Sequence, residues 1–420
     1  MKETTIEFEH YNLHIIPTKR FKQVKVRVVF HDEIKKDEIT IRNFLGDMLT
    51  YSSKTYNTSR DLSIIMQELY SIDAYHNTFR IGNIITSNFF LTFLNPKYTE
   101  KNMYENSIKF LSELLFNPNI KDNQFDRDSF KIIKKFTKEE IEGQKENTKS
   151  YSIIRMLENM STSPISYRTT GYLDDLNRIT PKNLYEYYKK FMLENNIDVF
   201  VLGDIDIDET KKLFKKHFPF KTRKRKIINP YIEAPKNINY QTIIEKEKVK
   251  QSKLSIGCYT KDLTSYEMKY PITLFNIILG SGTDSKFFKD IREKESLAYY
   301  IYSTCNKADN TIIISSGINY KDFNKTVDLI KQKLDEMKQG EFSEKDITKA
   351  KKLFQTSIEE IVDRQYTLID MYFIMTILDI DKMKTRINKM NKVTKEEIVK
   401  VANKVHIDTI YMLGGNYGKN

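Results

Sequence analysis

Asn43 and Asp47 are spaced along a predicted helix as a pair of metal ligands would be. In "IRNFLGDMLTYSS" (41–53), apolar residues repeat at helical spacing, and these two polar residues lie one turn apart on the other face, beside Gly46. Two histidines at this spacing bind zinc through neutral ring nitrogens, and a neighbouring glutamate takes a proton from the metal-bound water. An amide is a poor zinc ligand, one carboxylate is not a site, and glycine cannot be a base. The helix therefore has the spacing of a zinc site without its ligands.

The composition is that of a folded, basic protein. The chain has 420 residues, enough for two or more domains, and its 40% hydrophobic and 12% aromatic residues argue against disorder as the main state. The net charge of +12 suits a nucleic-acid-binding face, but 57 acidic residues are interspersed among the basic ones. Only "KTRKRK" (221–226) is a dense basic run, and it has the composition of a linker. We therefore expect no nucleic-acid partner.

The cysteines and the N-terminus indicate a cytoplasmic protein. Cys258 and Cys305 are the only cysteines, which excludes a disulfide framework and a CxxC metal pair. "MKETTIEFEH" carries charges where a signal peptide needs an apolar core. No apolar run reaches the roughly 18 residues of a membrane helix, so we expect no membrane association.

Two segments of the chain resemble each other, which predicts an internal repeat. "ITPKNLYEYYKKFMLENNIDVFVLGDI" (179–205) and "VTKEEIVKVANKVHIDTIYMLGGN" (393–416) both begin with a β-branched residue and an N-capping Thr. Both continue through an amphipathic helix into a strand that ends at Leu-Gly. The two threonines are 214 positions apart and the two glycines 211, so the offset is nearly constant.

The predicted fold is α+β, with two homologous α/β-sandwich domains. Each half opens with apolar residues at strand spacing, in 13–30 and 253–260, and closes with the repeated helix and strand. Mixed elements in this order favour a mainly antiparallel sheet packed with helices. We expect domains at 1–221 and 231–420, joined by a basic linker at 222–230 that ends in Pro.

A glycine-containing turn in the second half has two interpretations. "LGSGTDSKFFKDIREKESLAYYIYS" (279–303) places two glycines before a predicted helix, as in a phosphate cradle. It does not match the P-loop pattern. The alternative is a flexible turn, capped by Thr283 or Asp284, before a helix whose apolar face includes Phe287, Phe288 and Ile291.

This stretch resembles the second-domain signature of the pitrilysin/insulinase family of zinc peptidases, which includes mitochondrial processing peptidase. The family pattern is an Asn before an apolar Leu-Gly segment, then a Ser, then Phe, Ile-Arg-Glu and Leu-Ala-Tyr. The resemblance spans essentially the whole chain. The matching residues are Asn276, Leu279, Gly280, Gly282, Ser285, Phe288, Ile291, Arg292, Glu293, Leu297, Ala298 and Tyr299.

The resemblance implies roles for Arg292 and Tyr299. In the family, an Arg and a Tyr seven residues later reach toward the zinc centre, bind the substrate carbonyl and stabilise the tetrahedral intermediate. Guanidinium and phenol groups are donors suited to a developing oxyanion. Without the resemblance, Arg292 is better interpreted as a cation at a helix C-terminus and Tyr299 as a strand aromatic.

The resemblance also accounts for the first helix, since the family's metal motif is His-x-x-Glu-His. Its three functional positions fall on Asn43, Gly46 and Asp47, and none of the six histidines stands at a spacing that replaces them. The family's third ligand, a Glu on a later helix, matches Glu140. On a helical wheel Glu140 falls on an apolar stripe, as a remnant of the ligand would, although a solvated rim residue is an equal alternative. We expect no metal in this chain.

These matches imply a catalytically inactive homologue that is not an enzyme alone. It resembles the non-catalytic subunits of two-subunit members, namely mitochondrial processing peptidase and the paired bacterial peptidases associated with elongation factor P modification. The expected partners are a zinc-bearing His-x-x-Glu-His homologue, with which it forms a clam-like chamber, and a peptide substrate added to a sheet edge. The alternatives are a stand-alone peptide-binding homodimer and a hydrolase with a different site, which Gly46 disfavours.

Overall fold

The computed structural model describes residues 3–100, 102–221 and 225–415, which form two compact units. Each unit has its own sheet and its own hydrophobic core. Unit 1 consists of Met1–Glu142, Arg168–Asn229 and Val362–Thr376. Unit 2 consists of Gly143–Tyr167, Pro230–Ile361 and Ile377–Asn420.

Unit 1 is built on a six-stranded sheet with the strand order β1-β2-β8-β3-β5-β4. Every neighbouring pair is antiparallel except β2 and β8. Alternate residues of β3 point to opposite faces, so Val24, Val26 and Val28 enter the core while Arg27 faces the other side. The strands are β1 (Thr4–Glu7), β2 (Asn12–Pro17), β3 (Gln23–Glu33), β4 (Asp73–Ile81), β5 (Ile84–Leu94) and β8 (Asn196–Gly203).

Amphipathic helices and the sheet of unit 1 enclose a single core. A two-stranded hairpin, β6 (Ile120–Lys121) and β7 (Gln124–Phe125), accompanies them. The helices are α1 (Ile39–Tyr51), α2 (Ser59–Glu68), α3 (Met103–Phe116), α4 (Arg127–Gly143), α6 (Leu173–Arg178), α7 (Pro181–Glu194), α8 (Ile207–His217) and α13 (Gln365–Ile377).

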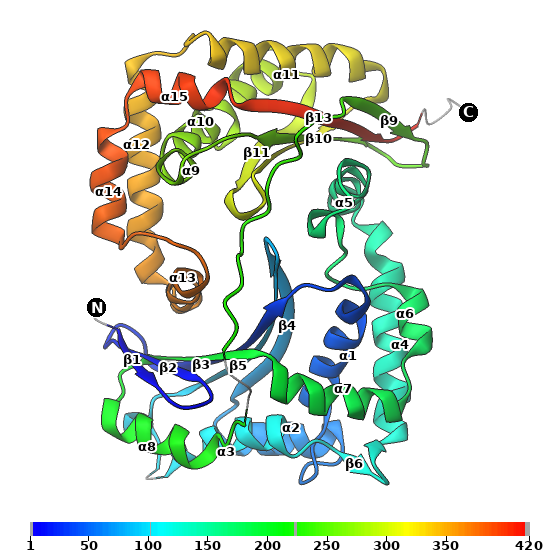
Figure 1. Cartoon of the computed structure of the whole chain (residues 1–420), viewed down its shortest axis with the longest axis vertical. Helices are drawn as coiled ribbons and strands as arrows, with labels where there is room; N and C mark the ends of the chain where they lie inside the picture. The colour runs from blue at the N-terminus through cyan, green and yellow to red at the C-terminus, as the bar shows by residue number, and fades with distance from the viewer. Residues whose placement is uncertain (1–2, 101, 222–224, 416–420) are drawn as a thin grey trace. The chain divides into compact units, whose positions relative to one another are not determined.

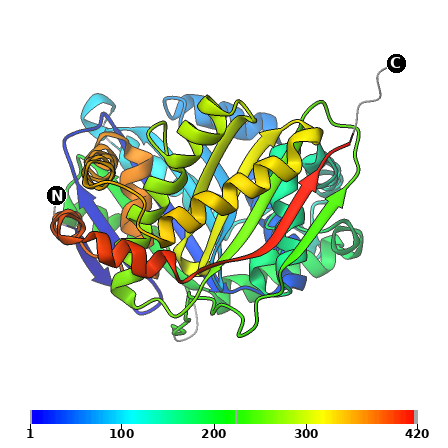
Figure 2. The ribbon, with the colours of Figure 1, turned by 90° about the horizontal axis from the view of Figure 1, so that it is seen from above.

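Unit 2 is built on a five-stranded sheet with the strand order β11-β12-β10-β13-β9. Its pairs are antiparallel except β13 and β9, which run side by side in Figure 2. The strands are β9 (Gln241–Glu245), β10 (Ser252–Thr260), β11 (Ala298–Asn306), β12 (Thr311–Ile318) and β13 (Val405–Leu413). The helices are α5 (Thr148–Met160), α9 (Ser265–Lys269), α10 (Pro271–Gly280), α11 (Phe323–Lys338), α12 (Glu344–Glu359), α14 (Met383–Lys392) and α15 (Lys395–Ala402), with a π-helix at Phe287–Lys294.

The two sheets share one topology, as the internal repeat predicts. The order β2-β8-β3-β5-β4 in unit 1 corresponds strand by strand to β9-β13-β10-β12-β11 in unit 2, with the parallel pair in the same place. The two similar segments of the sequence are α7-β8 and α15-β13. Their helices begin at Thr180 and Thr394, each in a reciprocal capping box. The predicted α+β fold with mainly antiparallel sheets is confirmed.

The two halves of the chain exchange helices. α5 belongs to the first half of the sequence but packs on β10 and β13 of unit 2. α13 belongs to the second half but packs on the unit 1 sheet, on the face opposite α8 (Figure 1). The compact units therefore differ from the contiguous domains expected at 1–221 and 231–420. Of the expected linker at 222–230, residues 222–224 lie outside the described residues.

Buried Arg27 fixes α13 to the sheet of unit 1. Its guanidinium donates to Asn88 Oδ1 at 3.0 and 2.8 Å, donates to the Asp370 carboxylate on α13, and stacks 3.9 Å from the ring centre of Phe373. Arg27 is completely buried, whereas the Asp370 side chain is 32% exposed.

In the described parts of the chain, every helix falls short of the length or apolar character that crossing a membrane requires.

Candidate functional site

Gly46 of the degenerate motif lies directly against a histidine from another element. α1 forms as predicted and buries Phe44, Leu45 and Gly46 itself. A Cβ atom on Gly46 would lie 2.1 Å from Cε1 of His76 and 2.2 Å from both ring nitrogens. The His76 ring thus occupies the space that the side chain of a general base would need. No larger residue fits at Gly46 unless that ring moves.

The sheet of unit 1 positions His76. It lies on edge strand β4, its side chain is 3% exposed, and its ring centre is 5.0 Å from that of Phe89 on β5. Its Nδ1 lies 3.6 Å from Asp47 Oδ1, beyond hydrogen-bond distance but close enough for attraction when the ring is protonated. No histidine stands at the motif spacing in the sequence, but the fold brings His76 against the motif from another element. The spacing of residues along α1 cannot reveal a histidine that approaches from a strand 30 residues further on in the sequence.

Glu140 lies at the rim of an open groove in unit 1, not on the buried face of α4. The buried face runs through Phe130, Ile133, Thr137 and Ile141. The stripe assigned from the sequence was wrong because Phe136 is 54% exposed. The groove, of about 330 Å³, lies between α1 and α4. Its lining residues are Asp47, Thr50, Tyr51, Ile133, Phe136, Thr137 and Glu140.

The groove has an acidic character that the neighbouring histidine moderates. Desolvation by the groove walls raises the pKa of Glu140, and the Asp47 carboxylate adds to this rise. The nearby His76 ring acts in the opposite direction. The Asp47 carboxylate therefore disfavours the charged form of Glu140.

The residues at the motif positions do not fit the zinc ion that is typical of the pitrilysin/insulinase peptidases. The Asn43 side-chain amide donates to the carbonyl oxygen of Thr169, so it is engaged in the structure of unit 1. His76 fills the position of the base, and Asp47 is the one motif residue with ligand chemistry. Within the described ranges, no three His, Cys, Asp or Glu side chains are grouped so that they could hold a metal ion. The described residues therefore supply no site for a metal-dependent step.

Arg292 and Tyr299 are both exposed and stand on a buried framework in unit 2. Ile291 and Ala298, the residues that precede them, are buried. The Arg292 guanidinium stacks 4.6 Å from the ring centre of Phe288, and none of the described residues accepts a hydrogen bond from it. Tyr299 is 61% exposed, with its hydroxyl 3.5 Å from Asn319 Oδ1. Arg292 therefore keeps its donors for a ligand, whereas the single Tyr299 donor makes a long hydrogen bond to Asn319 that a ligand would have to replace.

A β-bulge directs Tyr299 away from the sheet. Along edge strand β11, Ala298 pairs with Ile318 and Tyr300 pairs with Gly317, which leaves Tyr299 as the extra residue. A Cβ on Gly317 would lie 2.6 Å from the Tyr300 ring, so glycine is needed there. Arg292 lies on the π-helix, and such helices are frequent at functional sites. The positions are thus special in backbone geometry as well as exposed.

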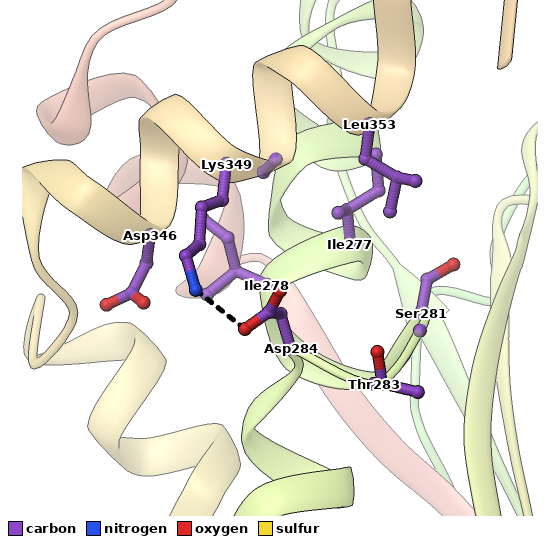
Figure 3. Close-up of a pocket in the computed structure, with 10 residues that line it drawn as sticks. Ile277, Ile278, Ser281, Thr283, Asp284, Asp346, Lys349 and Leu353 are labelled. Carbon is purple, nitrogen blue, oxygen red and sulfur yellow. Dashed lines mark hydrogen bonds and ion pairs between the residues drawn. The ribbon is translucent and has the colours of Figure 1, made fainter. Parts of the chain in front are cut away.

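The turn before the π-helix forms one end of a pocket of about 340 Å³ in unit 2. Ser285, and not the predicted Thr283 or Asp284, holds the turn, since its Oγ donates to Gly282 O at 2.7 Å and lies 3.4 Å from Phe288 N. At the pocket mouth Asp284 pairs with Lys349 at 2.7 Å (Figure 3). Asp284 also pairs with Lys289 at 3.1 Å, so both lysines beside the turn are already bound to a carboxylate, which does not favour the phosphate-cradle interpretation.

Known proteins resemble this chain in sequence and in fold. Residues 178–354 match the family model described as the peptidase M16 inactive domain. The chain is 29% identical over 410 residues to "Probable inactive metalloprotease YmfF" of Bacillus subtilis (strain 168), a match that covers 96% of both chains. The chain is therefore similar to inactive members of the M16 family of peptidases. Its resemblance to the pitrilysin/insulinase peptidases is confirmed, and it is an inactive homologue within this group.

Solved structures show the same M16 fold. A conserved protein from Enterococcus faecalis V583 has a TM-score of 0.90 and 26% identity, with complete coverage of both chains. A peptidase M16 inactive domain from Pseudomonas fluorescens has a TM-score of 0.78 and 15% identity, again over both complete chains. The second likeness shows the fold alone. The roles of Arg292 and Tyr299, and the expected partner, stay predictions.

Proposed function

We propose that this M16 homologue is the non-catalytic subunit of a heterodimeric metallopeptidase. Its partner is a zinc-bearing His-x-x-Glu-His homologue, to which it supplies Arg292 and Tyr299 in trans. The observation that carries the proposal is the contrast between the two units. Unit 1 has lost the ligand and base at Asn43 and Gly46, whereas unit 2 keeps two exposed donors on specialised backbone.

The two donors suit the chemistry of peptide hydrolysis. Arg292 offers N–H groups that no described side chain or backbone group uses, and Tyr299 offers one hydroxyl on an edge strand. Negative charge develops on the substrate carbonyl oxygen in the tetrahedral transition state, and preorganised donors stabilise it there more than in the ground state. The zinc ion and the general base that activate water would come from the partner.

The peptide substrate would bind as an added strand. Edge strand β11 has one unpaired side, and Tyr299 stands at its start, so a peptide added there would present its backbone carbonyls near this hydroxyl. Such binding uses main-chain hydrogen bonds and therefore tolerates varied side chains. It is compatible with a chain that binds peptides but cleaves none by itself.

Coexpression with a candidate catalytic homologue tests the proposal. We expect size-exclusion chromatography with light scattering to show a stable complex. The complex should have peptidase activity, whereas this chain alone and the complex treated with a chelator should have none. Exclusive assembly into a homodimer that binds peptides without any cleavage would support the alternative of a stand-alone peptide-binding protein.

A further inference from the structure

A small cavity in unit 2 gathers positive charge from three separate elements. It lies between the α9–α10 junction, the turn that follows β11, and the segment before and within α14. Each of these elements contributes one cation: Lys269, Lys307 and Arg386, respectively. The other lining residues are Tyr231, Met268, Tyr270, Leu378, Asp379, Ile380 and Asp381.

The two carboxylates of the cavity are already committed to other groups. Asp379 pairs with Lys269 at 2.5 Å, and its side chain is 81% exposed to solvent. Asp381 accepts a hydrogen bond from the Tyr270 hydroxyl and pairs with Lys389 at 2.8 Å. Neither carboxylate therefore forms an ion pair with Lys307 or Arg386.

Among the described residues, Lys307 and Arg386 consequently form no ion pair with these carboxylates, although Asp381 attracts Arg386 from beyond ion-pair distance. Lys307 Nζ donates to the backbone carbonyl of Lys269 at 3.0 Å, and the Arg386 guanidinium stacks 5.7 Å from the Phe354 ring centre. None of the described residues accepts a hydrogen bond from that guanidinium. Burial lowers the pKa of Lys307 to about 8, and the positive charges of Arg386 and Lys269 add to the shift. The neighbouring cations thus add to the cost of charging Lys307 in this cavity.

From this arrangement we propose that the cavity binds a small oxyanion, with inorganic phosphate as its simplest representative. An oxyanion there would accept hydrogen bonds from Arg386 and Lys307 and relieve their mutual repulsion. The cavity volume of about 40 Å³ is roughly three times what one water molecule requires, which suits a phosphate or carboxylate group but not a nucleotide. The site is separate from Arg292 and Tyr299 and does not depend on the proposed function.

Isothermal titration of the full chain with sodium phosphate, at constant ionic strength, tests the site. We expect Arg386→Gln and Lys307→Gln each to weaken phosphate binding by about 10- to 100-fold, the effect of losing a charge-assisted hydrogen bond. Lys384→Gln is the matched control, because it removes an exposed positive charge from α14 outside the cavity. It should change the affinity by less than about twofold.

A parallel titration with sodium acetate distinguishes the source of the oxyanion. Tighter binding of phosphate assigns the site to phosphoryl groups, and tighter binding of acetate assigns it to carboxylates. Circular dichroism checks that each variant folds. If Arg386→Gln does not fold, Arg386→Lys replaces it, because lysine keeps the positive charge but lacks the planar guanidinium group. No saturable binding of either anion, or equal losses in Lys384→Gln and Arg386→Gln, would overturn the proposal.

Discussion

Enlarging Gly46 by one methyl group tests whether His76 has taken over the space of the general base. Replacing glycine by alanine inside a helix normally stabilises by roughly 1 kcal/mol. At Gly46 the new Cβ would lie 2.1–2.2 Å from three atoms of a buried ring. Such overpacking typically costs about 1–3 kcal/mol. Gly46→Ala should therefore lower the free energy of unfolding, by up to about 2 kcal/mol after the helix gain is subtracted.

A double-mutant cycle isolates the contact. In a His76→Ala background the ring is absent, so Gly46→Ala should raise the free energy of unfolding by roughly 1 kcal/mol relative to that background. The coupling between the two positions should thus be about 1–3 kcal/mol. Gly143→Ala is the matched control, because a Cβ at this α4 glycine meets nothing within 4 Å. It should be neutral or stabilising in both backgrounds.

The assay is urea denaturation of the four proteins of the cycle and of the control, followed by circular dichroism. Equal effects of Gly46→Ala with and without His76 would refute the steric argument. A stabilising Gly46→Ala in the wild-type background would do the same. In either case the motif position would be open, and the loss of the base would need a different explanation.

Three further predictions concern metal, pH and the exchanged helix. Elemental analysis of the purified chain should find less than stoichiometric zinc, and near-equimolar zinc with chelator-sensitive cleavage would contradict this. Burial lowers the pKa of His14, but the hydrogen bonds that its ring donates to the Asp198 and Glu3 carboxylates raise this pKa above 6.5 overall. The stability that His14→Gln removes should therefore be largest below pH 6.5 and fade as pH rises through the raised pKa. Asp370→Ala should lower the free energy of unfolding by about 3–5 kcal/mol because it leaves the buried Arg27 charge without its partner. Arg27→Met should cost less because the Asp370 carboxylate reaches solvent. Equal losses in the two variants would argue against this asymmetry.

The regular part of the fold follows from local patterns. Thr180 and Thr394 predict the starts of two helices because a threonine side chain satisfies the first backbone N–H groups, and both form capping boxes. The alternation of Val24, Val26 and Val28 predicts a strand with one face in the core, which is where they lie. Such patterns are short-range, so a single sequence is enough to identify them.

The arrangement of elements in space does not follow in the same way. Amphipathic α5 and the more uniformly apolar α13 must each bury a face, but their patterns do not say against which sheet. Each packs on the sheet of the other half. Arg27 illustrates the difficulty. Its place between core valines predicts an outward, solvated side chain, yet α13 covers it completely.

For the candidate site as well, some features could be predicted from the sequence and others could not. The loss of a ligand at Asn43 and of the general base at Gly46 could be predicted because the residue type alone decides it. The presence of His76 could not, since it depends on how β4 pairs with β5 and packs on α1. The exposure of Tyr299 depends on a β-bulge whose position is fixed by pairing with Gly317, a contact distant in sequence.

The central claim is that this chain acts on the substrate through Arg292 in trans, and turnover of the reconstituted complex tests it most directly. Arg292→Ala, combined with a wild-type catalytic partner, should reduce kcat by about 100- to 1000-fold, the usual effect of losing one oxyanion donor. Its Tm should not change, because the exposed guanidinium makes one ring contact and no hydrogen bond with the described residues. Tyr299→Phe should give a smaller loss, and Lys294→Ala, which removes an exposed charge from the same π-helix, should give none. Wild-type turnover in complexes that contain Arg292→Ala would contradict the account.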